Sequence, residues 1–558
     1  MNRKQELYVA DFETTTDEKD CRVWGWGLTA LKKDYLKINN SIQSFLNHIS
    51  MLKNPVIYFH NLKFDSEFIL YYLLSNNYEF VKNPKDLKHK SFNCLKTDTG
   101  VIYSLQYMQG ANLITIYDSL KILPFSVQVM AKTFNLDIKK GDIDYNKFRH
   151  ENHEITDHER DYIINDVEIV KKSLNFMFDN NLKGITLASM CLNEYKSIIG
   201  KRNFERWFPI IDDDKFCRES YKGGFTYVNP KFQNVVINEG TVFDVNSLYP
   251  AVMRYDKLPY GKPIPFDGEP NKNEHTFHDL FIVKISCSFE LKEGYIPSIQ
   301  MKNNGLFAST EYLTSSNNYD VELTLTSVDY ELFFKHYNVY GLNYLGGYYF
   351  KSSTTLFGDY IDKWTKVKIN ATLEGNKGMR TLSKLMLNSL YGKFGLNPKS
   401  GLKEPYLSEN NIVKWTPYDG EERATIYVPL ASFVTSYARK LTIESAQQNY
   451  DRFIYADTDS IHLVGRHEPD NIEIDSVKLG KWKHEYYFKR GRFIRAKTYI
   501  EEKDDGHNHI ACAGLPVKLH EKVNFDNFVS GFEVYGKLRP KKVSGGVVLE
   551  ESTFKIKS

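Results

Sequence analysis

The chain has 558 residues, 42% of them apolar and 26% charged, which predicts several globular domains with a large core. Its 73 basic and 70 acidic residues give a net charge of only +3, so a nucleic-acid partner is not demanded and any positive surface must be local. The six cysteines lack zinc-ligand spacing and no run of about 18 apolar residues occurs, so we expect a soluble, intracellular protein with reduced thiols.

The N-terminal region places acidic residues on predicted strands. The first apolar run predicts a buried strand with Asp11 and Glu13 on one face. A second predicted strand, over residues 56–60, leads into Asn61-Leu-Lys-Phe-Asp65 and an apolar helix. Each of these acids alone is interpreted more simply as a solvated surface group.

The helical pattern of residues 159–170 adds a further acid. Tyr162 and Asp166 are four residues apart and therefore share a helix face. The Tyr162 hydroxyl could orient an attacking water. The combined acids are enough to hold two metal ions: Asp11, Glu13, Asp65 and Asp166.

In this order, D-x-E, N-x-x-[FY]-D and Y-x-x-x-D resemble the Exo I, Exo II and Exo III motifs of DnaQ-type 3′–5′ exonucleases. The resemblance implies an RNase H-like α/β domain over residues 1–190 that hydrolyses the terminal phosphodiester of single-stranded DNA. It also implies that Lys140 steadies the scissile phosphate, with a solvated loop lysine as the alternative. The side chains expected at the frayed 3′ end are Asn61, Phe64, Phe68, Ser119, Leu120 and Tyr145, although phenylalanines at helical spacing are also typical of a core.

Two short segments follow in the middle of the chain. The paired glycines of Tyr221-Lys-Gly-Gly-Phe225 permit a turn with close approach to a partner. Residues 241–250 form an apolar strand that ends in Asp244, then a turn and the bulky Tyr249. Taken alone, the first is an ordinary turn and Tyr249 is a core tyrosine.

A pair of basic helices is predicted over residues 359–372 and 378–394. In the second, Lys384 lies four residues after Arg380, and Tyr391 seven after Lys384, so the three share a face that Asn388 joins. Such a stripe suits a triphosphate with a base stacked at one end, and Lys368 can assist from the facing helix. The alternative is an amphipathic helix whose lysines reach out to water.

Residues 455–463 read as strand, Asp-rich turn, strand. Asp457 and Asp459 are two apart, so on an extended chain they project the same way and repel each other unless a cation such as Mg²⁺ lies between them. The alternative is a turn that Asp merely caps. With Asp244 from a separate strand, the acids can hold two metal ions about 3.5–4 Å apart for phosphoryl transfer.

Together, D-x-x-S-L-Y-P, K-L-M-L-N-S-L-Y-G-K-F-G and Y-x-D-T-D-S resemble motifs A, B and C of family B DNA polymerases. The resemblance implies two Mg²⁺ ions per active site, with Mn²⁺ as a substitute, and these metal ligands: Asp244, Val245, Asp457 and Asp459. Tyr249 would exclude the 2′-hydroxyl of ribonucleotides and Tyr391 would meet the nascent base pair. The remaining nucleotide-binding residues would be Arg380, Lys384, Lys368 and Asn388.

Further DNA contacts come from the same resemblance. Tyr221, Gly223 and Gly224 match the Y-x-G-G segment that touches template DNA. Thr435 and Arg439 match T-x-x-G-R as phosphate contacts, with Ala438 in place of the glycine. Lys497 and Tyr499 match the K-x-Y motif that grips the primer strand.

The spacing of these motifs predicts two insertions, because 140 residues separate Asp244 from Lys384 (384 − 244 = 140). A short chain with two such insertions resembles the protein-primed family B polymerases of small Bacillus phages, of the phi-twenty-nine type. The implied fold is multidomain α/β and α+β, with these ranges: exonuclease 1–190, palm 191–260 and 427–527, first insertion 261–357, fingers 358–395, second insertion 396–426 and thumb 528–558. Within them we expect a strand at 280–286, a helix at 328–337 and a basic-aromatic strand at 479–483.

The resemblance also implies partners and a setting. The first insertion would contact a terminal protein that primes synthesis as a heterodimer, and the second would close around downstream DNA and support strand displacement. The other partners would be primer–template DNA, deoxynucleoside triphosphates and a phage single-stranded DNA-binding protein. The enzyme would otherwise act as a monomer in the host-cell cytoplasm, away from membranes.

Two alternatives stay open. One is a polymerase that is not protein-primed or is RNA-templated, such as a reverse transcriptase; there, adjacent paired acids and a nuclease after the polymerase are more usual, whereas Asp457 and Asp459 are separated. The other is a non-catalytic DNA-binding scaffold. Seven acids across two sites argue against it, because an inactive site has no reason to keep such repelling charges.

Overall fold

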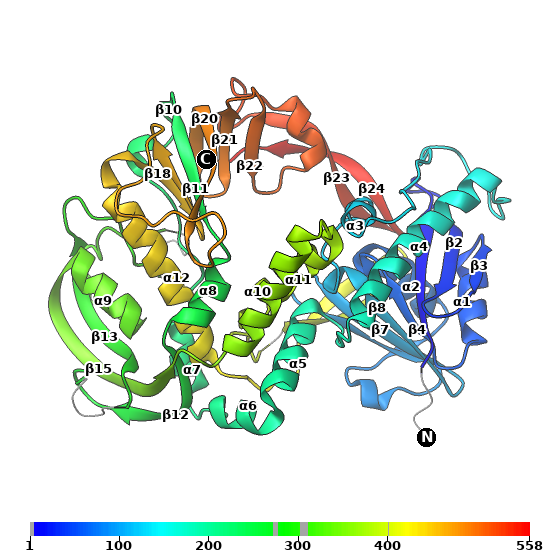
Figure 1. Ribbon diagram of the computed structural model, residues 1–558. Helices are drawn as coiled ribbons and strands as arrows, with labels where there is room; N and C mark the ends of the chain where they lie inside the picture. Colours follow the sequence, from blue (N-terminus) through cyan, green and yellow to red (C-terminus); the bar gives the residue numbers. More distant parts are fainter. Residues whose placement is uncertain (1–4, 272–276, 302–310, 400, 558) are drawn as a thin grey trace.

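The computed structural model describes residues 5–271, 277–301, 311–399 and 401–557. A large mixed sheet and a large antiparallel sheet lie on opposite sides of the molecule, and a pair of long helices stands between them (Figure 1). The C-terminal hairpin spans from one side to the other. Among the described residues, no helix combines the length and apolar character needed to cross a membrane.

The N-terminal domain is an eight-stranded sheet in the order β3-β2-β1-β4-β8-β7-β6-β5, in which β1 pairs parallel with β4, and β4 parallel with β8. Helix α4 packs against β1 and β2, which brings two of the predicted motifs together. The elements are β1 (Leu7–Thr14), β2 (Val23–Ala30), β3 (Leu36–Asn39), α1 (Ile42–Ser50), β4 (Val56–Phe59), α2 (Leu62–Ser75), β5 (Glu79–Phe80), β6 (Ser91–Lys96), β7 (Ile102–Gln109), β8 (Asn112–Asp118), α3 (Val127–Thr133) and α4 (Asp157–Asp179).

Three helices connect this domain to the next sheet: α5 (Leu187–Ile199), α6 (Lys201–Trp207) and α7 (Asp214–Glu219). The predicted border at residue 190 falls inside α5. Tyr195 of this helix stacks on Phe357, with ring centroids 4.7 Å apart, and α5 packs against α10 and α11. Helix α5 therefore packs with the helices of the predicted fingers.

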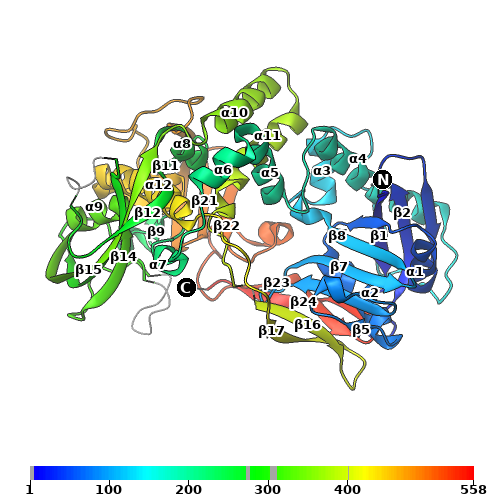
Figure 2. The same ribbon diagram turned by 90° about the horizontal axis from the view of Figure 1, so that it is seen from below.

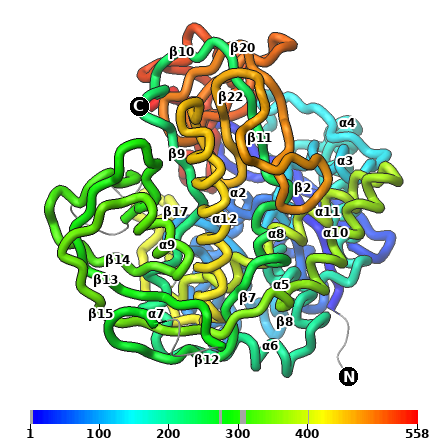
Figure 3. The backbone as a smooth tube through the Cα atoms, turned by 60° about the vertical axis from the view of Figure 1, so that its left-hand side comes forward, coloured from blue at the N-terminus to red at the C-terminus, as the bar shows by residue number. Residues whose placement is uncertain are grey.

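The second large sheet has the order β22-β21-β20-β11-β19-β18-β9, with β10 paired to β20. Helices α8 and α12 pack against each other beside it, and α12 runs along the middle of the molecule in Figure 3. The elements are β9 (Thr226–Val228), β10 (Val236–Ile237), β11 (Gly240–Val245), α8 (Leu248–Tyr255), α12 (Val428–Gln448), β18 (Phe453–Asp457), β19 (Ser460–Val464), β20 (Trp482–Arg495), β21 (Thr498–Lys503) and β22 (Asn508–Cys512).

The first predicted insertion forms a four-stranded sheet in the order β12-β15-β13-β14. The expected strand at 280–286 is part of β13, and the expected helix at 328–337 is α9, shifted by one residue. Residues 272–276 and 302–310 of this insertion lie outside the described residues. The elements are β12 (Leu258–Phe266), β13 (Leu280–Leu291), β14 (Val321–Thr326), α9 (Ser327–His336) and β15 (Tyr337–Ser353).

The predicted fingers are the antiparallel helices α10 (Gly358–Leu373) and α11 (Lys377–Ser389), which pack against each other. Two hairpins complete the chain. The second insertion forms β16 (Gly401–Leu407) and β17 (Val413–Asp419), and the C-terminal region forms β23 (Glu533–Val543) and β24 (Gly546–Lys555). Figure 2 shows the two hairpins lying side by side against the N-terminal domain.

One expected strand is shorter than predicted. Residues 479–481 form a loop, and β20 begins only at Trp482. Gly480 has φ +79°, its backbone N–H donates to the Asn246 carbonyl at 2.8 Å, and the Asn246 N–H donates to Lys481 O at 2.9 Å. The loop is therefore tied to the turn after β11 rather than paired in a sheet.

Candidate active sites

The N-terminal acids converge from β1 and α4. Ligand atoms of Asp11, Glu13 and Asp166 all lie within 4.8 Å of one another, and no other such group of acidic, His or Cys side chains occurs among the described residues. Asp166 Oδ1 is buried and has no hydrogen-bond partner. Such an oxygen is costly to leave unpaired, so its position indicates a ligand.

Electrostatics at this cluster also fit a bound cation. Burial raises the pKa of Asp11 to about 7, and repulsion from Asp166 adds to the effect. Burial, then Asp11 and Asp166, raise the pKa of Glu13 well above its usual range. Asp65, on α2, behaves likewise through burial and Asp11. Buried carboxylates that repel one another are the environment that a divalent cation stabilises.

The other predicted exonuclease residues surround this cluster. Lys140 Nζ lies 2.8 Å from Asp166 Oδ2, with its side chain one-third exposed. The Tyr162 and Tyr145 hydroxyls are 2.6 Å apart. Tyr162 is buried beside the acids, whereas Tyr145 is exposed, so the pair reaches from the cluster to solvent.

The residues predicted to contact the 3′ end divide into two groups. Asn61 is exposed and has φ +71°, a left-handed conformation that Asn tolerates, while Phe64 and Leu120 are half-buried. Ser119 is fully buried, and its hydroxyl donates to the Phe59 carbonyl at 3.0 Å. Phe68 is 2% exposed and packs under the C-terminal hairpin. In this structure, Ser119 and Phe68 therefore act inside the domain rather than at its surface.

The second acidic site lies where β11 meets the β18–β19 turn. Asp244 pairs with Ser460 across the sheet, and the Val245 N–H donates to Asp459 O at 2.7 Å. Burial raises the pKa of Asp244 to about 7, with Asp459 as the main repelling charge, and burial followed by Asp457 raises that of Asp459. At such sites one or two carboxylates and the substrate phosphates bind Mg²⁺, and these acids can supply the carboxylates.

Asp457 is held by its neighbours. Its carboxylate accepts from Thr226 Oγ1 at 3.0 Å and from the Tyr455 hydroxyl at 3.3 Å, and Lys497 Nζ lies 3.8 Å away. Thr458, between the two acids, has φ +60°. This conformation is strained for a β-branched residue, and such strain is typical of functional turns.

Opposite these acids, α10 and α11 present cations. Arg380, Lys384 and Asn388 are exposed on α11, and Lys368 Nζ of α10 donates to Ser247 Oγ at 3.2 Å. Burial lowers the pKa of Lys368, and repulsion by Arg380, Lys384 and Lys483 lowers it further. An anion placed among these side chains would relieve that repulsion.

Lys483 was not among the predicted site residues. It pairs with Asp244 in the register of β20 against β11 and lowers the Asp244 pKa. Its basic-aromatic segment was visible in the sequence, but only the long-range strand pairing brings it beside the acid.

The two predicted tyrosines of the nucleotide site touch each other. The rings of Tyr249 and Tyr391 have centroids 4.4 Å apart and are tilted by 31°. Tyr249 lies on α8, five residues after Asp244 of β11, and Tyr391 just after α11. The fingers therefore meet the palm at the point where a nucleotide sugar and base are expected.

Several predicted DNA contacts lie inside the molecule. Thr435 is 1% exposed and donates to the Ala431 carbonyl at 3.1 Å, and Tyr499 is 8% exposed, stacked on Phe493 at 5.1 Å. Arg439 is buried in an ion pair with Asp329 at 2.7 Å. In this structure these side chains pack within the protein, and their contacts with DNA stay predictions.

Arg439 connects to the Y-x-G-G segment. Its guanidinium donates to the carbonyls of Lys222 at 3.0 Å and Gly223 at 2.7 Å. Gly224 packs against Thr458 in the β18–β19 turn, since a carbon added at its Cβ position would be 2.7 Å from Thr458 Oγ1. The ring of Tyr221, half-buried, packs on Gly395. This segment therefore links α12 to the turn that carries Asp457 and Asp459.

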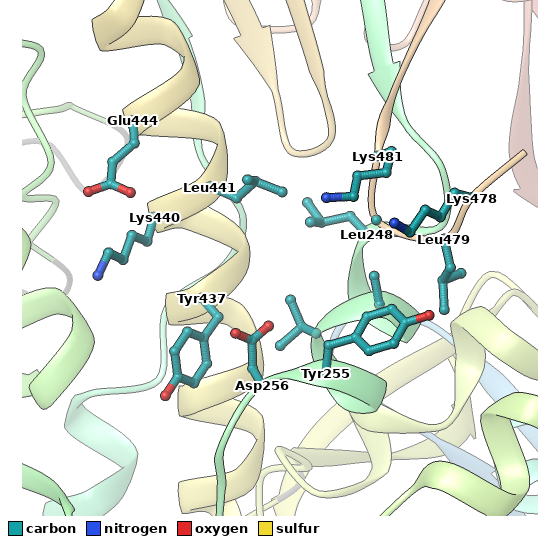
Figure 4. Close-up of a pocket in the computed structure, with 13 residues that line it drawn as sticks. Leu248, Tyr255, Asp256, Tyr437, Lys440, Leu441, Glu444, Lys478, Leu479 and Lys481 are labelled. Carbon is teal, nitrogen blue, oxygen red and sulfur yellow. The ribbon is translucent and has the colours of Figure 1, made fainter. Parts of the chain in front are cut away.

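A separate cavity of about 580 Å³ lies between α8, α12 and the loop of residues 478–481 (Figure 4). Asp256 points into it, and burial raises its pKa to about 6, with Lys440 acting in the opposite direction. None of the predicted catalytic residues lines this cavity. Its lining contains none of the palm acids and none of the predicted nucleotide-binding residues, so it is separate from the second acidic site.

Sequence comparison defines the class of this protein. The chain matches the family described as DNA polymerase type B, organellar and viral, over residues 46–158 and 142–477. It therefore belongs to the family B DNA polymerases, the class that the two acidic sites and their supporting sheets also indicate.

Individual relatives narrow this class. The DNA polymerase of Bacillus phage Nf is 43% identical over the whole of both chains, that of Bacillus phage phi29 is 42% identical over 99% of each, and that of Streptococcus phage Cp-1 is 36% identical over 99% of this chain and 98% of its own. The structure of phi29 DNA polymerase complexed with primer-template DNA and incoming nucleotide covers 99% of this chain and 100% of its own, with 41% identity and a TM-score of 0.93. The chain is a family B DNA polymerase of the phi29 type, with an exonuclease-type domain followed by palm, fingers and thumb.

Proposed function

We propose that this polymerase starts DNA chains on a terminal protein, extends them processively with strand displacement, and proofreads them with a 3′–5′ exonuclease. The observation that carries the proposal is the presence of two separate acidic sites, one in the N-terminal domain and one in the palm, in a chain with two insertions. The likeness to phi29 polymerase complexes with primer-template DNA and with single-stranded DNA supports both substrates.

Nucleotide addition would take place between the palm acids and the fingers. Asp244, Asp457 and Asp459 would hold Mg²⁺, which when bound offsets the negative charge of the phosphates and lowers the pKa of the attacking 3′-hydroxyl. Arg380, Lys384 and Lys368 would bind the triphosphate, and their mutual repulsion in the free enzyme favours an anion there. Tyr249 would lie under the sugar and exclude a 2′-hydroxyl, and Tyr391, in contact with it, would cover the base.

Excision would take place at the N-terminal cluster. Asp11, Glu13, Asp65 and Asp166 would hold the metal ions, and the unpaired Asp166 oxygen supports a cation at this position. Tyr162, buried beside the acids, would orient the attacking water. Lys140 pairs with Asp166 in the free protein and would turn to the scissile phosphate.

The thumb and the second insertion would enclose DNA. Both hairpins rest on the N-terminal domain: Thr97 pairs with Leu402, and Val413, Val543 and Val547 belong to that domain's hydrophobic core. The palm, thumb, N-terminal domain and second insertion would thus form a closed ring around the template, and leaving the DNA would require one contact of the ring to open.

The first insertion would meet the terminal protein, and the enzyme, otherwise monomeric, would act in the host cytoplasm with a phage single-stranded DNA-binding protein. Labelled dATP and Mg²⁺, supplied with candidate terminal proteins and no oligonucleotide, test the priming mode. We expect covalent label on a terminal protein with the wild type and none with Asp459→Asn. Extension that always requires an oligonucleotide would contradict protein priming and favour the alternative of a conventionally primed polymerase.

A further inference from the structure

Three parts of the chain meet at one buried carboxylate on α2. Glu67 is 3% exposed and lies two residues after the exonuclease residue Asp65. Its Oε1 is 2.8 Å from Lys542 Nζ of the thumb and 3.4 Å from Lys96 Nζ of the N-terminal sheet. One carboxylate therefore serves two ammonium groups from different domains.

The second insertion contributes an aromatic ring to the same place. Lys96 Nζ lies 3.6 Å from the centroid of the Trp415 ring, and Lys542 Nζ lies 5.2 Å from it. Lys542 also donates to the Val413 carbonyl at 3.4 Å. Both cations are thus shared between a carboxylate and an aromatic face, an arrangement that is strongest when desolvated.

The thumb tip lies directly on the N-terminal domain beside this cluster. Gly545 has φ +95°, and a carbon at its Cβ position would lie 2.1 Å from the Cys21 carbonyl oxygen. A carbon at the Cβ position of Gly546 would lie 2.6 Å from the Phe68 ring. Apolar contact therefore brings the hairpins onto α2, and the charged cluster fixes how they are placed.

We propose that Glu67 is a positioning residue that keeps the ring of palm, thumb, N-terminal domain and second insertion closed, by acting as the common counter-ion of Lys96 and Lys542. This inference rests on the proposed role of that ring in processive synthesis. It assigns the closure of the ring to one contact that the N-terminal domain, the thumb and the second insertion share, and not to either hairpin alone.

The physical reason is the cost of leaving the two lysines without their carboxylate. Burial lowers the pKa of Lys96 to about 8, Glu67 opposes this, and Lys542 lowers it further. Without Glu67, the buried Lys96 ammonium and the partly exposed Lys542 ammonium would repel each other beside one indole ring. Breaking a buried ion pair by removing one partner is strongly destabilising, whereas replacing all its members by apolar residues often is not.

Glu67→Gln tests the proposal, because it removes the charge and keeps the shape. Glu404→Gln is the matched control: Glu404 lies on the second insertion and pairs with Lys82 of the N-terminal domain at 3.4 Å, but the two side chains are 35% and 61% exposed, against 4% for Glu67. The triple variant Glu67→Met, Lys96→Met, Lys542→Met removes all the charges together. Product length on a long primed circle with competitor DNA as a trap reports one binding event.

We expect Glu67→Gln to shorten the products made in the presence of the trap roughly tenfold and to leave the rate of single-nucleotide addition unchanged. The triple variant should restore most of the product length. Hydrogen exchange in β16, β17, β23 and β24 should rise in Glu67→Gln and not in Glu404→Gln. Wild-type product length for Glu67→Gln, or a triple variant as short as Glu67→Gln, would overturn the proposal. Deleting residues 396–426 distinguishes failure of the Glu67 proposal from failure of the proposed ring. If the deletion shortens the products and Glu67→Gln does not, the ring forms without this contact and the Glu67 proposal is wrong. If neither change shortens the products, the proposed ring is wrong.

Discussion

Gly224 is the position where one added carbon should disturb catalysis most specifically. Its Cβ position lies 2.7 Å from Thr458 Oγ1, 2.8 Å from Cγ2 and 3.1 Å from Cβ. Thr458 cannot easily move away, because its φ is +60° and its N–H donates to the Phe225 carbonyl at 2.6 Å. In Gly224→Ala the strain therefore passes to the turn that holds Asp457 and Asp459.

The expected size of the effect follows from the geometry. Overpacking of this kind costs about 1–3 kcal/mol. A displacement of about 1 Å at a reacting centre lowers a rate by roughly 100-fold. We therefore expect Gly224→Ala to reduce single-nucleotide addition by roughly 100-fold while degradation of single-stranded DNA, at a separate site, stays within roughly twofold.

Gly223→Ala is the control for crowding at the turn, since no protein atom lies within 4 Å of its Cβ position; because Gly223 is also a predicted template contact, the rates are compared at saturating primer–template. The assay is rapid-quench addition of one nucleotide to a primer–template, run beside excision of a labelled single strand. Gly224→Ala combined with Thr458→Ala removes the two nearest atoms and should recover most of the rate. Equal activity of Gly223→Ala and Gly224→Ala, or no recovery in the double variant, would refute this reasoning.

Three other predictions address the sites and the ring. Tyr249→Val should raise kcat/KM for ribonucleotides by roughly tenfold or more, because a steric clash of about 1–3 kcal/mol is removed; unchanged sugar discrimination in steady-state kinetics would leave Tyr249 as a core residue. Folding raises the pKa values of Asp11 and Asp244 from the usual 3.8 to about 7, so the metal-free protein should lose stability as the pH increases from about 4 to about 7. The rise in melting temperature that Mg²⁺ causes should be larger at pH 8 than at pH 6, because at pH 6 the metal must displace protons from these acids. A Mg²⁺ effect that does not depend on pH would count against these acids as ligands. Deleting residues 396–426 should leave single-nucleotide addition nearly intact but shorten products on a primed circle under trap and reduce extension through duplex; full-length products would identify the insertion as a passive loop.

Local patterns in the sequence predicted the elements that carry the motifs. The alternation around Asp11 and Glu13 and the four-residue spacing of Tyr162 and Asp166 depend only on strand and helix geometry, and these residues do lie on β1 and α4. The helix with Arg380 and Lys384 was predictable for the same reason.

Long-range pairing limited the rest. Ser119 turns inward, where its hydroxyl donates a hydrogen bond to the Phe59 carbonyl. Arg439 is buried in a pair with Asp329 of the first insertion, and the two residues are 110 positions apart in the sequence. Lys542 and Glu67 are 475 positions apart. No local periodicity contains such pairs, so the contacts that link the domains could be found only from the fold.

The claim that two independent acidic sites perform synthesis and excision is tested most directly by one crossed experiment. A 5′-labelled primer–template is incubated with the wild type, Asp459→Asn, or Asp11→Ala combined with Asp65→Ala, with and without deoxynucleoside triphosphates. Asp459 lies in the palm turn and Asp11 on β1 of the N-terminal domain, so each variant should lose one activity and keep the other. We expect Asp459→Asn only to shorten the primer and the double variant only to extend it. Loss of both activities in either variant, or extension by Asp459→Asn, would contradict the account.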